Sequence, residues 1–171
     1  DGSVLWLLKA NEWSEINLKA EAKKRGIHGN RLIFADKIKV EEHLARQKLA
    51  DLFLDTFNFN AHTTASDALR VGLPIVTKIG KGFAARVTSS LLNSLKTPEL
   101  ITKSEKEYEA LALSLANNVE KLTSIKKKLA DNRISAPLFD TESYTKHLEK
   151  AYTKAYECFK NELPPKDIKL L

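Results

Sequence analysis

Short, almost wholly apolar runs recur through the first half of this chain and constrain its fold more than any other feature. Four of them predict strands: 4–8, 31–34, 52–55 and 75–77. Within each run the apolar residues are consecutive and do not alternate with polar ones, which is typical of strands buried on both faces. Helical segments separate the runs, so the pattern predicts an α/β fold with a parallel sheet and flanking helices.

The predicted helices fill the intervals and dominate the second half of the chain. Their expected ranges are 14–25, 41–48, a helix ending near 71, 83–95, 104–117, 119–130 and 141–160. Ser14 is the expected cap of the first helix and Gly26 its stop signal. Ser104 and Glu107 have the spacing of a capping box at the start of a later helix. The chain is therefore expected to end in long helices.

Composition limits the class of protein. A length of 171 residues suits one domain, and 43% apolar with 29% charged residues is typical of a globular protein. No apolar run approaches a membrane span, and the start lacks a signal-peptide pattern, so no membrane partner is expected. Cys158 is the single cysteine, which excludes an intrachain disulfide and favours a reducing compartment.

Charge and histidine spacing narrow the ligand classes. The net charge of +6 suits an anionic ligand, but the lysines are mixed with glutamates. The densest run, 126–128, is expected to be a solvated helix face, so no nucleic-acid partner is predicted. The four histidines are scattered without a metal-binding motif, and no metal is predicted: His28, His43, His62 and His147.

The segment 60–67, Asn-Ala-His-Thr-Thr-Ala-Ser-Asp, lies where a predicted strand-to-helix loop becomes the first turn of a helix. The N–H groups of such a turn lack partners within the helix and attract anions, above all phosphate. Threonine hydroxyls can donate to a phosphate, and Asp67 can accept from a ribose hydroxyl. The segment predicts a nucleotide pocket, although His62 as a cap and Asp67 as a helix-dipole partner remain structural alternatives.

A second loop is expected at the same edge of the sheet. Residues 36–40 follow the predicted strand 31–34, and ligands of parallel α/β sheets bind beyond the carboxyl ends of the strands. The two loops are therefore predicted to converge on one ligand. The next helix carries His43, for which a purely structural role is the alternative.

Collinear motifs along nearly the whole chain resemble one family. They are 4–8, Glu42-His43, 49–51, Leu54-Asp55-Thr56, Asn60 with His62-Thr63-Thr64, Gly72 with Pro74, Arg86-Val87, Leu100-Ile101, and 134–135 followed by 137–139. Together they resemble the protein O-GlcNAc transferases. The His-Thr-Thr motif with Asp67 downstream is the most specific part of this resemblance.

The resemblance implies a GT-B fold, in which two Rossmann-like halves enclose the active site. This chain is similar to the carboxyl-terminal half, which holds the sugar nucleotide. Residues 1–139 would form the Rossmann-like domain without its first strand and helix, 140–163 a helix packing back on the catalytic core, and 164–171 a tail. The amino-terminal half and the TPR region that binds protein substrates would lie upstream.

The family implies an inverting transfer of N-acetylglucosamine from UDP-GlcNAc to Ser or Thr of intracellular proteins, without a metal or other cofactor. A cytoplasmic location follows, extending to the nucleus in a eukaryote. Protein acceptors would bind through parts absent from these residues, so the chain alone is expected to be inactive.

The resemblance also assigns roles residue by residue. His62, Thr63 and Thr64 would hold the diphosphate, Asp67 the ribose, and Asn60 would belong to the same donor site. His43 would pack against the uracil with Arg46 near the base, while Ile38 and Lys39 would lie in the loop that contacts the uracil edge through backbone groups. One departure is Val40, where the family has a lysine. Lys39 is the neighbouring lysine, but its side chain would leave the backbone in a different direction, so the contact of the family lysine is not carried over to it.

Three alternatives stay open at this point. A related protein O-fucosyltransferase using GDP-fucose would differ in the base-reading loop, 38–40. A scaffold module could keep the fold without catalysis. Nucleic-acid binding is the remaining option, and it predicts salt-sensitive retention on RNA.

Overall fold

The computed structural model describes residues 2–170 and divides the chain into two compact units, Asp1–Arg46 and Gln47–Leu171. We refer to these as unit 1 and unit 2 and describe each by itself. Both contain parallel strands with flanking helices, so the predicted fold class is confirmed.

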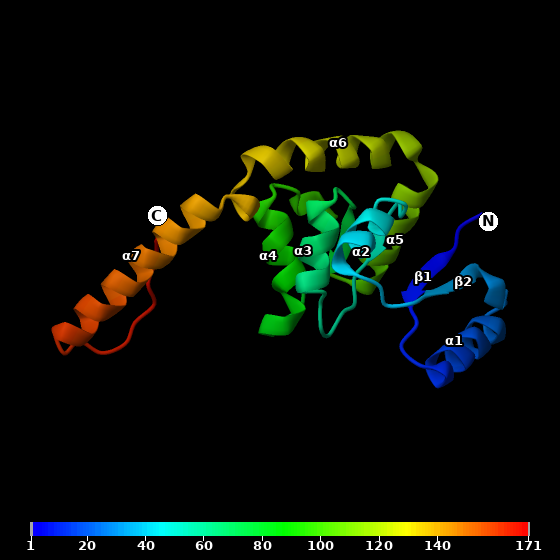
Figure 1. The fold of residues 1–171 in the computed structure, drawn as a ribbon, viewed down its shortest axis with the longest axis horizontal. Helices are drawn as coiled ribbons and strands as arrows, with labels where there is room; N and C mark the ends of the chain where they lie inside the picture. Colours follow the sequence, from blue (N-terminus) through cyan, green and yellow to red (C-terminus); the bar gives the residue numbers. More distant parts are fainter. Residues whose placement is uncertain (1, 171) are drawn as a thin grey trace. The chain divides into compact units, whose positions relative to one another are not determined.

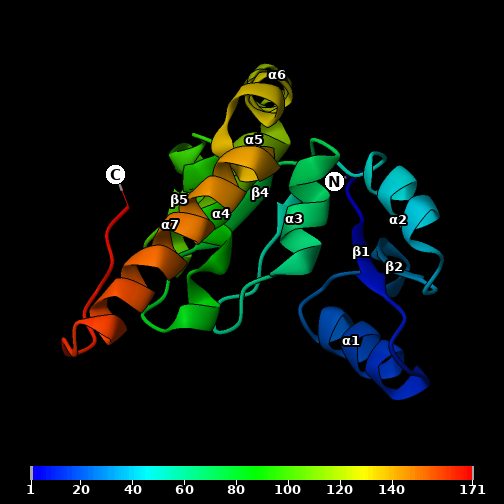
Figure 2. The ribbon, with the colours of Figure 1, turned by 60° about the vertical axis from the view of Figure 1, so that its left-hand side comes forward.

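Unit 1 is built on two parallel strands, β1 (Leu5–Leu8) and β2 (Leu32–Ala35), with Leu5 opposite Leu32. Helix α1 (Glu12–Lys24) and the 3₁₀ turn η1 (Gly29–Arg31) connect them. Helix α2 (Val40–Gln47) follows β2. Figure 2 shows α1 beside the strands, and the Lys19 ammonium lies 5.5 Å from the centre of the Phe34 ring of β2.

The start of α1 differs from the sequence prediction. Asn11 is the N-cap, and its Oδ1 accepts a hydrogen bond of 2.8 Å from the backbone N–H of Ser14. Ser14 therefore lies in the first turn, so its prediction as the cap was wrong. Asparagine and serine are almost equally good caps, so local sequence alone does not choose between them.

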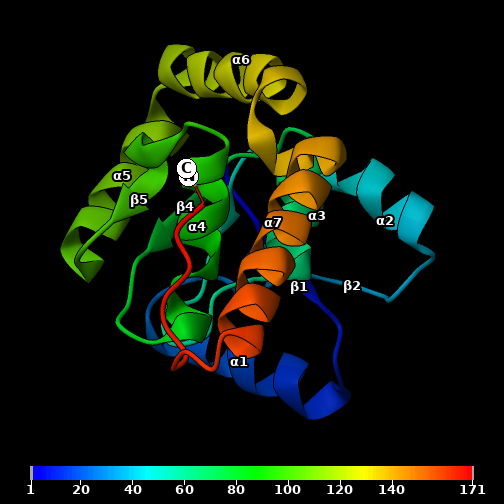
Figure 3. The same ribbon diagram turned by 90° about the vertical axis from the view of Figure 1, so that its left-hand side faces the viewer.

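Unit 2 contains three parallel strands in the order β3-β4-β5. They are β3 (Phe53–Leu54), β4 (Ile75–Lys78) and β5 (Ile101–Thr102). Helices α3 (Thr63–Arg70), α4 (Val87–Ser94) and α5 (Glu105–Asn117) follow the three strands in turn. In Figure 3, β4 and β5 lie between α5 on one side and α4 on the other.

The core of unit 2 lies where α3, α4, α5 and the following helix α6 (Val119–Ser135) meet the central strand β4. Its largest fully buried apolar side chains are Leu69, Ile75, Val76, Leu92, Leu95, Leu100, Leu115 and Leu129. Figure 1 shows α6 lying across the ends of α3 and α5. This core fixes α3, and with it the segment predicted to bind phosphate.

Two turns depart from the predicted pattern. The expected helix 83–95 is divided into the 3₁₀ turn η2 (Phe83–Ala85) and α4. The two-residue strand β5 was not predicted; it follows the 3₁₀ turn η3 (Pro98–Leu100).

The last elements of the chain are the turn η4 (Pro137–Phe139) and α7 (Thr141–Lys160), and the bounds of α7 match the prediction. No residue of α7 is buried, and four of its aromatic side chains are exposed: Tyr144, Tyr152, Tyr156 and Phe159. Packing of this helix against a catalytic core stays a prediction, as do the other predicted domain bounds. Among the described residues, no helix is long and apolar enough to cross a membrane.

Candidate functional site

A hollow of about 490 Å³ lies in unit 2, where β3 ends and α3 begins. It is lined by Phe53, Leu54, Asp55, Thr56, Phe59, Asn60, Ala61, His62, Thr63 and Thr64. Four of the predicted donor-binding residues are thus brought together: Asn60, His62, Thr63 and Thr64. The hollow lies beyond the carboxyl end of a parallel strand, the place expected for a ligand of such a sheet.

The first turn of α3 has no side-chain cap. His62 occupies the N-cap position without a capping hydrogen bond. The hydroxyls of Thr63 and Thr64 are exposed, and neither makes a hydrogen bond to another described residue. The free N–H groups, the positive end of the helix dipole and two free hydroxyls therefore face the same hollow, an arrangement suited to an anion.

The other end of α3 is closed by the backbone. Gly72 has a φ of +85°, the left-handed conformation that favours glycine. Its N–H donates to the carbonyl of Leu69, and the N–H of Leu73 donates to that of Ala68. This is a Schellman ending, which satisfies the last carbonyls of the helix. At the other end of α3, which faces the hollow, no side chain caps the first N–H groups of the helix.

Aromatic rings hold the His62 imidazole in place. The Phe59 ring stacks on it with centroids 4.7 Å apart and planes inclined by 15°, and the Phe83 ring meets it edge-on at 6.1 Å. Its Nε2 atom lies 3.4 Å from the carbonyl oxygen of Ala84. Phe59 is itself 65% exposed and lines the hollow, so this side chain is available to a ligand.

Asp67 lies one turn further along α3 and is half-buried. Its carboxylate makes no hydrogen bond or ion pair with another described residue, and it does not line the hollow. The free carboxylate can accept hydrogen bonds from a ligand that extends beyond the hollow, as the predicted ribose contact requires.

Asp55 and Asn60 support the loop that leads to His62, although the sequence assigns Asp55 no role in the site beyond its place in a family motif. Asp55 follows β3, is 3% exposed, and accepts hydrogen bonds from three donors. The Asn60 amide donates to the carbonyl of Thr56 at 2.7 Å. The Asn60 Oδ1 atom is buried and has no hydrogen-bond partner.

Gly80 has a structural role in the turn that precedes α4. The Gly80 N–H donates to the carbonyl of Ala85 at 2.8 Å, and a Cβ on Gly80 would lie 2.5 Å from the Ala85 Cβ. Glycine is therefore required to close the turn that carries Phe83. Neither Gly80 nor Gly82 lines the hollow.

Tyr108 of α5 lies behind this loop. Its hydroxyl donates to the backbone carbonyl of Asp55 at 3.0 Å, and its ring meets Phe57 edge-on at 4.9 Å. Burial, and to a smaller extent the negative charge of Asp55, raise the pKa of Tyr108 to about 12. The phenol therefore stays protonated and keeps donating at neutral pH.

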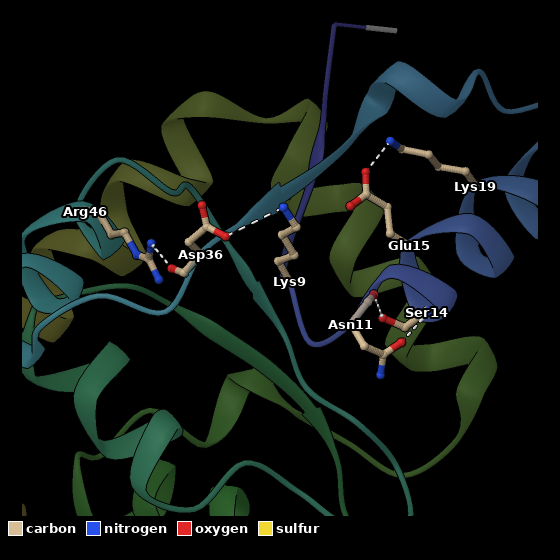
Figure 4. Close-up of polar contacts among 7 residues, drawn as sticks. All are labelled: Lys9, Asn11, Ser14, Glu15, Lys19, Asp36 and Arg46. Carbon is tan, nitrogen blue, oxygen red and sulfur yellow. Dashed lines mark hydrogen bonds and ion pairs between the residues drawn. The ribbon is translucent and has the colours of Figure 1, made fainter.

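The remaining predicted residues form a separate group in unit 1. Arg46 of α2 donates through Nε to Nδ1 of His43 at 3.2 Å and through Nη1 to the carbonyl of Asp36 at 2.8 Å. Its guanidinium lies 5.6 Å from the Trp6 ring centre. Figure 4 shows Arg46 directed at the Asp36 backbone and Lys9 facing the Asp36 carboxylate. Arg46 thereby fixes both the loop after β2 and the His43 ring.

Ile38 and Lys39 lie on the exposed stretch between β2 and α2. The Lys39 carbonyl accepts from the His43 N–H at 2.9 Å, while its ammonium makes no ion pair among the described residues. Val40, which stands where the family has a lysine, is the first residue of α2 and is exposed. Within residues 2–170, no three His, Cys, Asp or Glu side chains are grouped closely enough to hold a metal ion.

Comparison with known proteins agrees with this architecture. The model of glycosyl transferase family 41 matches residues 1–148. A probable UDP-N-acetylglucosamine–peptide N-acetylglucosaminyltransferase, SEC of Arabidopsis thaliana, is 36% identical over 99% of this chain. The enzyme of that description from Caenorhabditis elegans is 33% identical over 95% of the chain. The chain spans only 17% and 14% of the length of these two relatives.

A solved structure extends the likeness to three dimensions. A mutant of the Thermobaculum terrenum O-GlcNAc transferase superposes with a TM-score of 0.83 and is 30% identical, covering 88% of this chain and 30% of its own. The family match spans most of the sequence, and the structural likeness includes the arrangement of strands and helices. The chain belongs to glycosyl transferase family 41.

Proposed function

We propose that this chain is the donor-binding part of an inverting, metal-independent protein O-GlcNAc transferase, which transfers N-acetylglucosamine from UDP-GlcNAc to Ser or Thr of intracellular proteins. The observation that carries the proposal is the uncapped first turn of α3, with His62, Thr63 and Thr64 facing one hollow. The names of the relatives, which are peptide N-acetylglucosaminyltransferases using UDP-N-acetylglucosamine, support this choice of donor.

In this proposal the first turn of α3 binds the diphosphate. When the bond to the sugar breaks, negative charge develops on the leaving UDP. Oriented N–H groups and hydroxyls can stabilise that charge in place of a metal ion. Thr63 and Thr64 donate through their free hydroxyls, His62 donates from its stacked position, and Asp67 accepts from the ribose.

The group in unit 1 would contact the base. His43 packs against the uracil, Arg46 lies near the base, and backbone groups at Ile38 and Lys39 meet the uracil edge. The hydrogen bond from Arg46 to His43 supports this role, because it fixes the orientation of the imidazole ring. Lys39 is the lysine next to Val40, and its exposed ammonium makes no ion pair among the described residues.

Catalysis requires more than this donor site. Acceptor positioning and activation of the Ser or Thr hydroxyl need groups outside these residues. We therefore expect no sugar transfer by the 171 residues alone. Transfer of labelled N-acetylglucosamine to a Ser/Thr peptide by the isolated chain would contradict this expectation.

The first test is calorimetric titration of UDP into the folded chain, with GDP in parallel. The proposal predicts UDP binding in the micromolar to millimolar range and weaker binding of GDP. Preferential binding of GDP would replace the proposal with fucose transfer. Binding of neither nucleotide, here and in a chain extended upstream, would favour a scaffold module.

A matched pair of histidine variants tests the site itself. His62→Ala removes a phosphate donor from the hollow and should weaken UDP binding roughly tenfold or more, because a hydrogen bond to a charged group contributes about 1.5–3 kcal/mol. His147→Ala, on the exposed face of α7, is the control and should leave the affinity unchanged. Equal affinities in both variants would remove His62 from the site.

A further inference from the structure

Asp55 is a buried carboxylate without a counterion. It is 3% exposed, and no ion pair joins it to any described residue. A buried charge is strongly destabilising unless hydrogen bonds replace its lost hydration. The hydrogen-bond donors around the Asp55 carboxylate therefore indicate its structural role in this fold.

Three hydrogen bonds from protein donors reach the Asp55 carboxylate. Its Oδ1 accepts from the backbone N–H groups of Thr56, at 2.9 Å, and of Ala61, at 2.7 Å. Its Oδ2 accepts from the hydroxyl of Thr77 at 2.7 Å. Charge-assisted hydrogen bonds of this length are the stronger ones found in proteins.

The first two bonds determine the shape of the loop 56–61. Thr56 and Ala61 are the first and last residues of this loop, and one oxygen atom holds both. Inside it, Thr56 donates through Oγ1 to the carbonyl of Phe59, and the Asn60 side chain donates to the carbonyl of Thr56. The loop is thus closed on itself immediately before His62 and the first turn of α3.

The other contacts of Asp55 connect the loop to the core. Thr77 belongs to the central strand β4 and is fully buried. The backbone N–H of Asp55 donates to the carbonyl of Val76 at 3.1 Å, and its carbonyl accepts from Tyr108 of α5. One residue therefore joins β4, α5 and both ends of the loop.

We propose that Asp55 is a positioning residue for the phosphate-binding turn: its carboxylate holds both ends of the loop 56–61 and so sets where His62, Thr63 and Thr64 meet the diphosphate. The inference rests on the proposed function, because it assumes that the ligand is a nucleoside diphosphate. Asp55 lines the hollow, but it is 3% exposed and both its carboxylate oxygens already accept from protein donors, so the proposal gives it no contact with the ligand. It acts by keeping the site formed before the ligand arrives.

The affinity for UDP relative to uridine separates positioning from general stability. Asp55→Ala removes the bonds at both loop ends, so UDP affinity should fall roughly tenfold or more while uridine affinity changes little. Thr77→Val is the matched control. It disturbs the same buried network and should lower stability, but it leaves the loop ends bonded and the UDP-to-uridine ratio as in the wild type.

A conservative variant adds a rescue. In Asp55→Asn the amide oxygen can still accept from Thr56 and Ala61, while the amide N–H₂ donates to the Thr77 hydroxyl, which can also accept. The asparagine variant should therefore recover most of the ratio lost in the alanine variant. If alanine and wild type have the same ratio, or if Thr77→Val lowers it as much as alanine does, the positioning role is wrong.

A measurement on the wild type covers the case in which Asp55→Ala does not fold. Hydrogen exchange at the amides of Thr56 and Ala61 should already be slow without nucleotide and change little when UDP is added. Fast exchange that slows only with UDP would show that the ligand orders the loop, and would overturn the inference. Absence of UDP binding to the wild type would instead contradict the proposed function, while these amides would still report whether Asp55 closes the loop.

Discussion

Unit 1 and unit 2 differ in how much buried structure holds their proposed binding residues. In unit 1, Leu32 is the one buried side chain among residues 2–46, and α1 buries none. In unit 2, a core of buried leucines and isoleucine fixes α3, and a buried carboxylate fixes the loop before it. The residues proposed to bind phosphate therefore lie on a packed core, whereas His43 and Arg46 lie beside two strands and are held by local bonds.

The chain contains natural probes that separate the units. Both tryptophans, Trp6 and Trp13, lie in unit 1. All four tyrosines lie in unit 2: Tyr108, Tyr144, Tyr152 and Tyr156. Tryptophan fluorescence thus follows unit 1, and tyrosine signals follow unit 2. Non-coincident urea transitions from the two probes would show that the units unfold separately.

The largest effect is expected from a core truncation in unit 2. Leu69→Ala should reduce the free energy of unfolding of unit 2 by about 2–5 kcal/mol, because Leu69 is fully buried among α3, β4 and α4 side chains. Leu32→Ala is the matched change in unit 1 and should have an effect below about 2 kcal/mol, since no other described side chain of unit 1 is buried and the exposed surroundings can close over the space it leaves. Urea unfolding followed by both probes measures the two effects. Equal losses of unfolding free energy would contradict the difference between the units.

Hydrogen exchange should show the same contrast in the wild-type protein. Amides of β4 lie in the centre of a three-stranded sheet, and those of β1 and β2 in a pair. We expect β4 amides to exchange at least about a hundredfold more slowly, a difference of about 2.8 kcal/mol in opening free energy. Mass spectrometry of peptides from each strand gives the rates. Comparable protection of β1 would mean that unit 1 is far more stable than its burial suggests.

A third test compares two helix caps of similar chemistry. Ser104 accepts from the Glu107 N–H at the start of α5, as Asn11 does from Ser14 in α1. Ser104→Ala should destabilise unit 2 by about 1 kcal/mol, because α5 is joined to the core. Asn11→Ala should shift only the tryptophan transition. A shift of the tyrosine transition in Asn11→Ala would indicate that the units unfold together.

The sequence predicted the elements whose signals are local. Hydrophobic spacing located β1, β2 and β4 within one or two residues, and α7 at its observed bounds. The capping box located α5. The two-residue β5 is too short to carry a pattern, and its pairing with Thr77 and Lys78 depends on tertiary structure. The break between η2 and α4 depends on the close contact of Gly80 with Ala85, which no local signal reveals.

The site divides in the same way. His62, Thr63 and Thr64 could be chosen as candidates because a strand end and a helix start are visible in the sequence. The role of Asp55 could not, because its partners Ala61 and Thr77 are 6 and 22 positions away. Only the folded chain brings them to one carboxylate. Burial and partner donors, not residue type, distinguish this aspartate from the exposed ones.

The smallest effect concerns Tyr108, whose hydroxyl joins α5 to Asp55. Because its pKa is raised from 10.0 to about 12 in the folded state, the contribution of the protonated phenol to stability is fully present below pH 10 and is lost as the pH rises through 12. Tyr108→Phe should be less stable than wild type at pH 8, with a gap that narrows above pH 10. Urea unfolding between pH 8 and 12 measures the gap, and Tyr152→Phe on the exposed face of α7 is the control. If the difference in unfolding free energy stays constant across this pH range, folding does not keep the Tyr108 hydroxyl protonated. The core behind the hollow would then be more open to solvent than its contacts indicate.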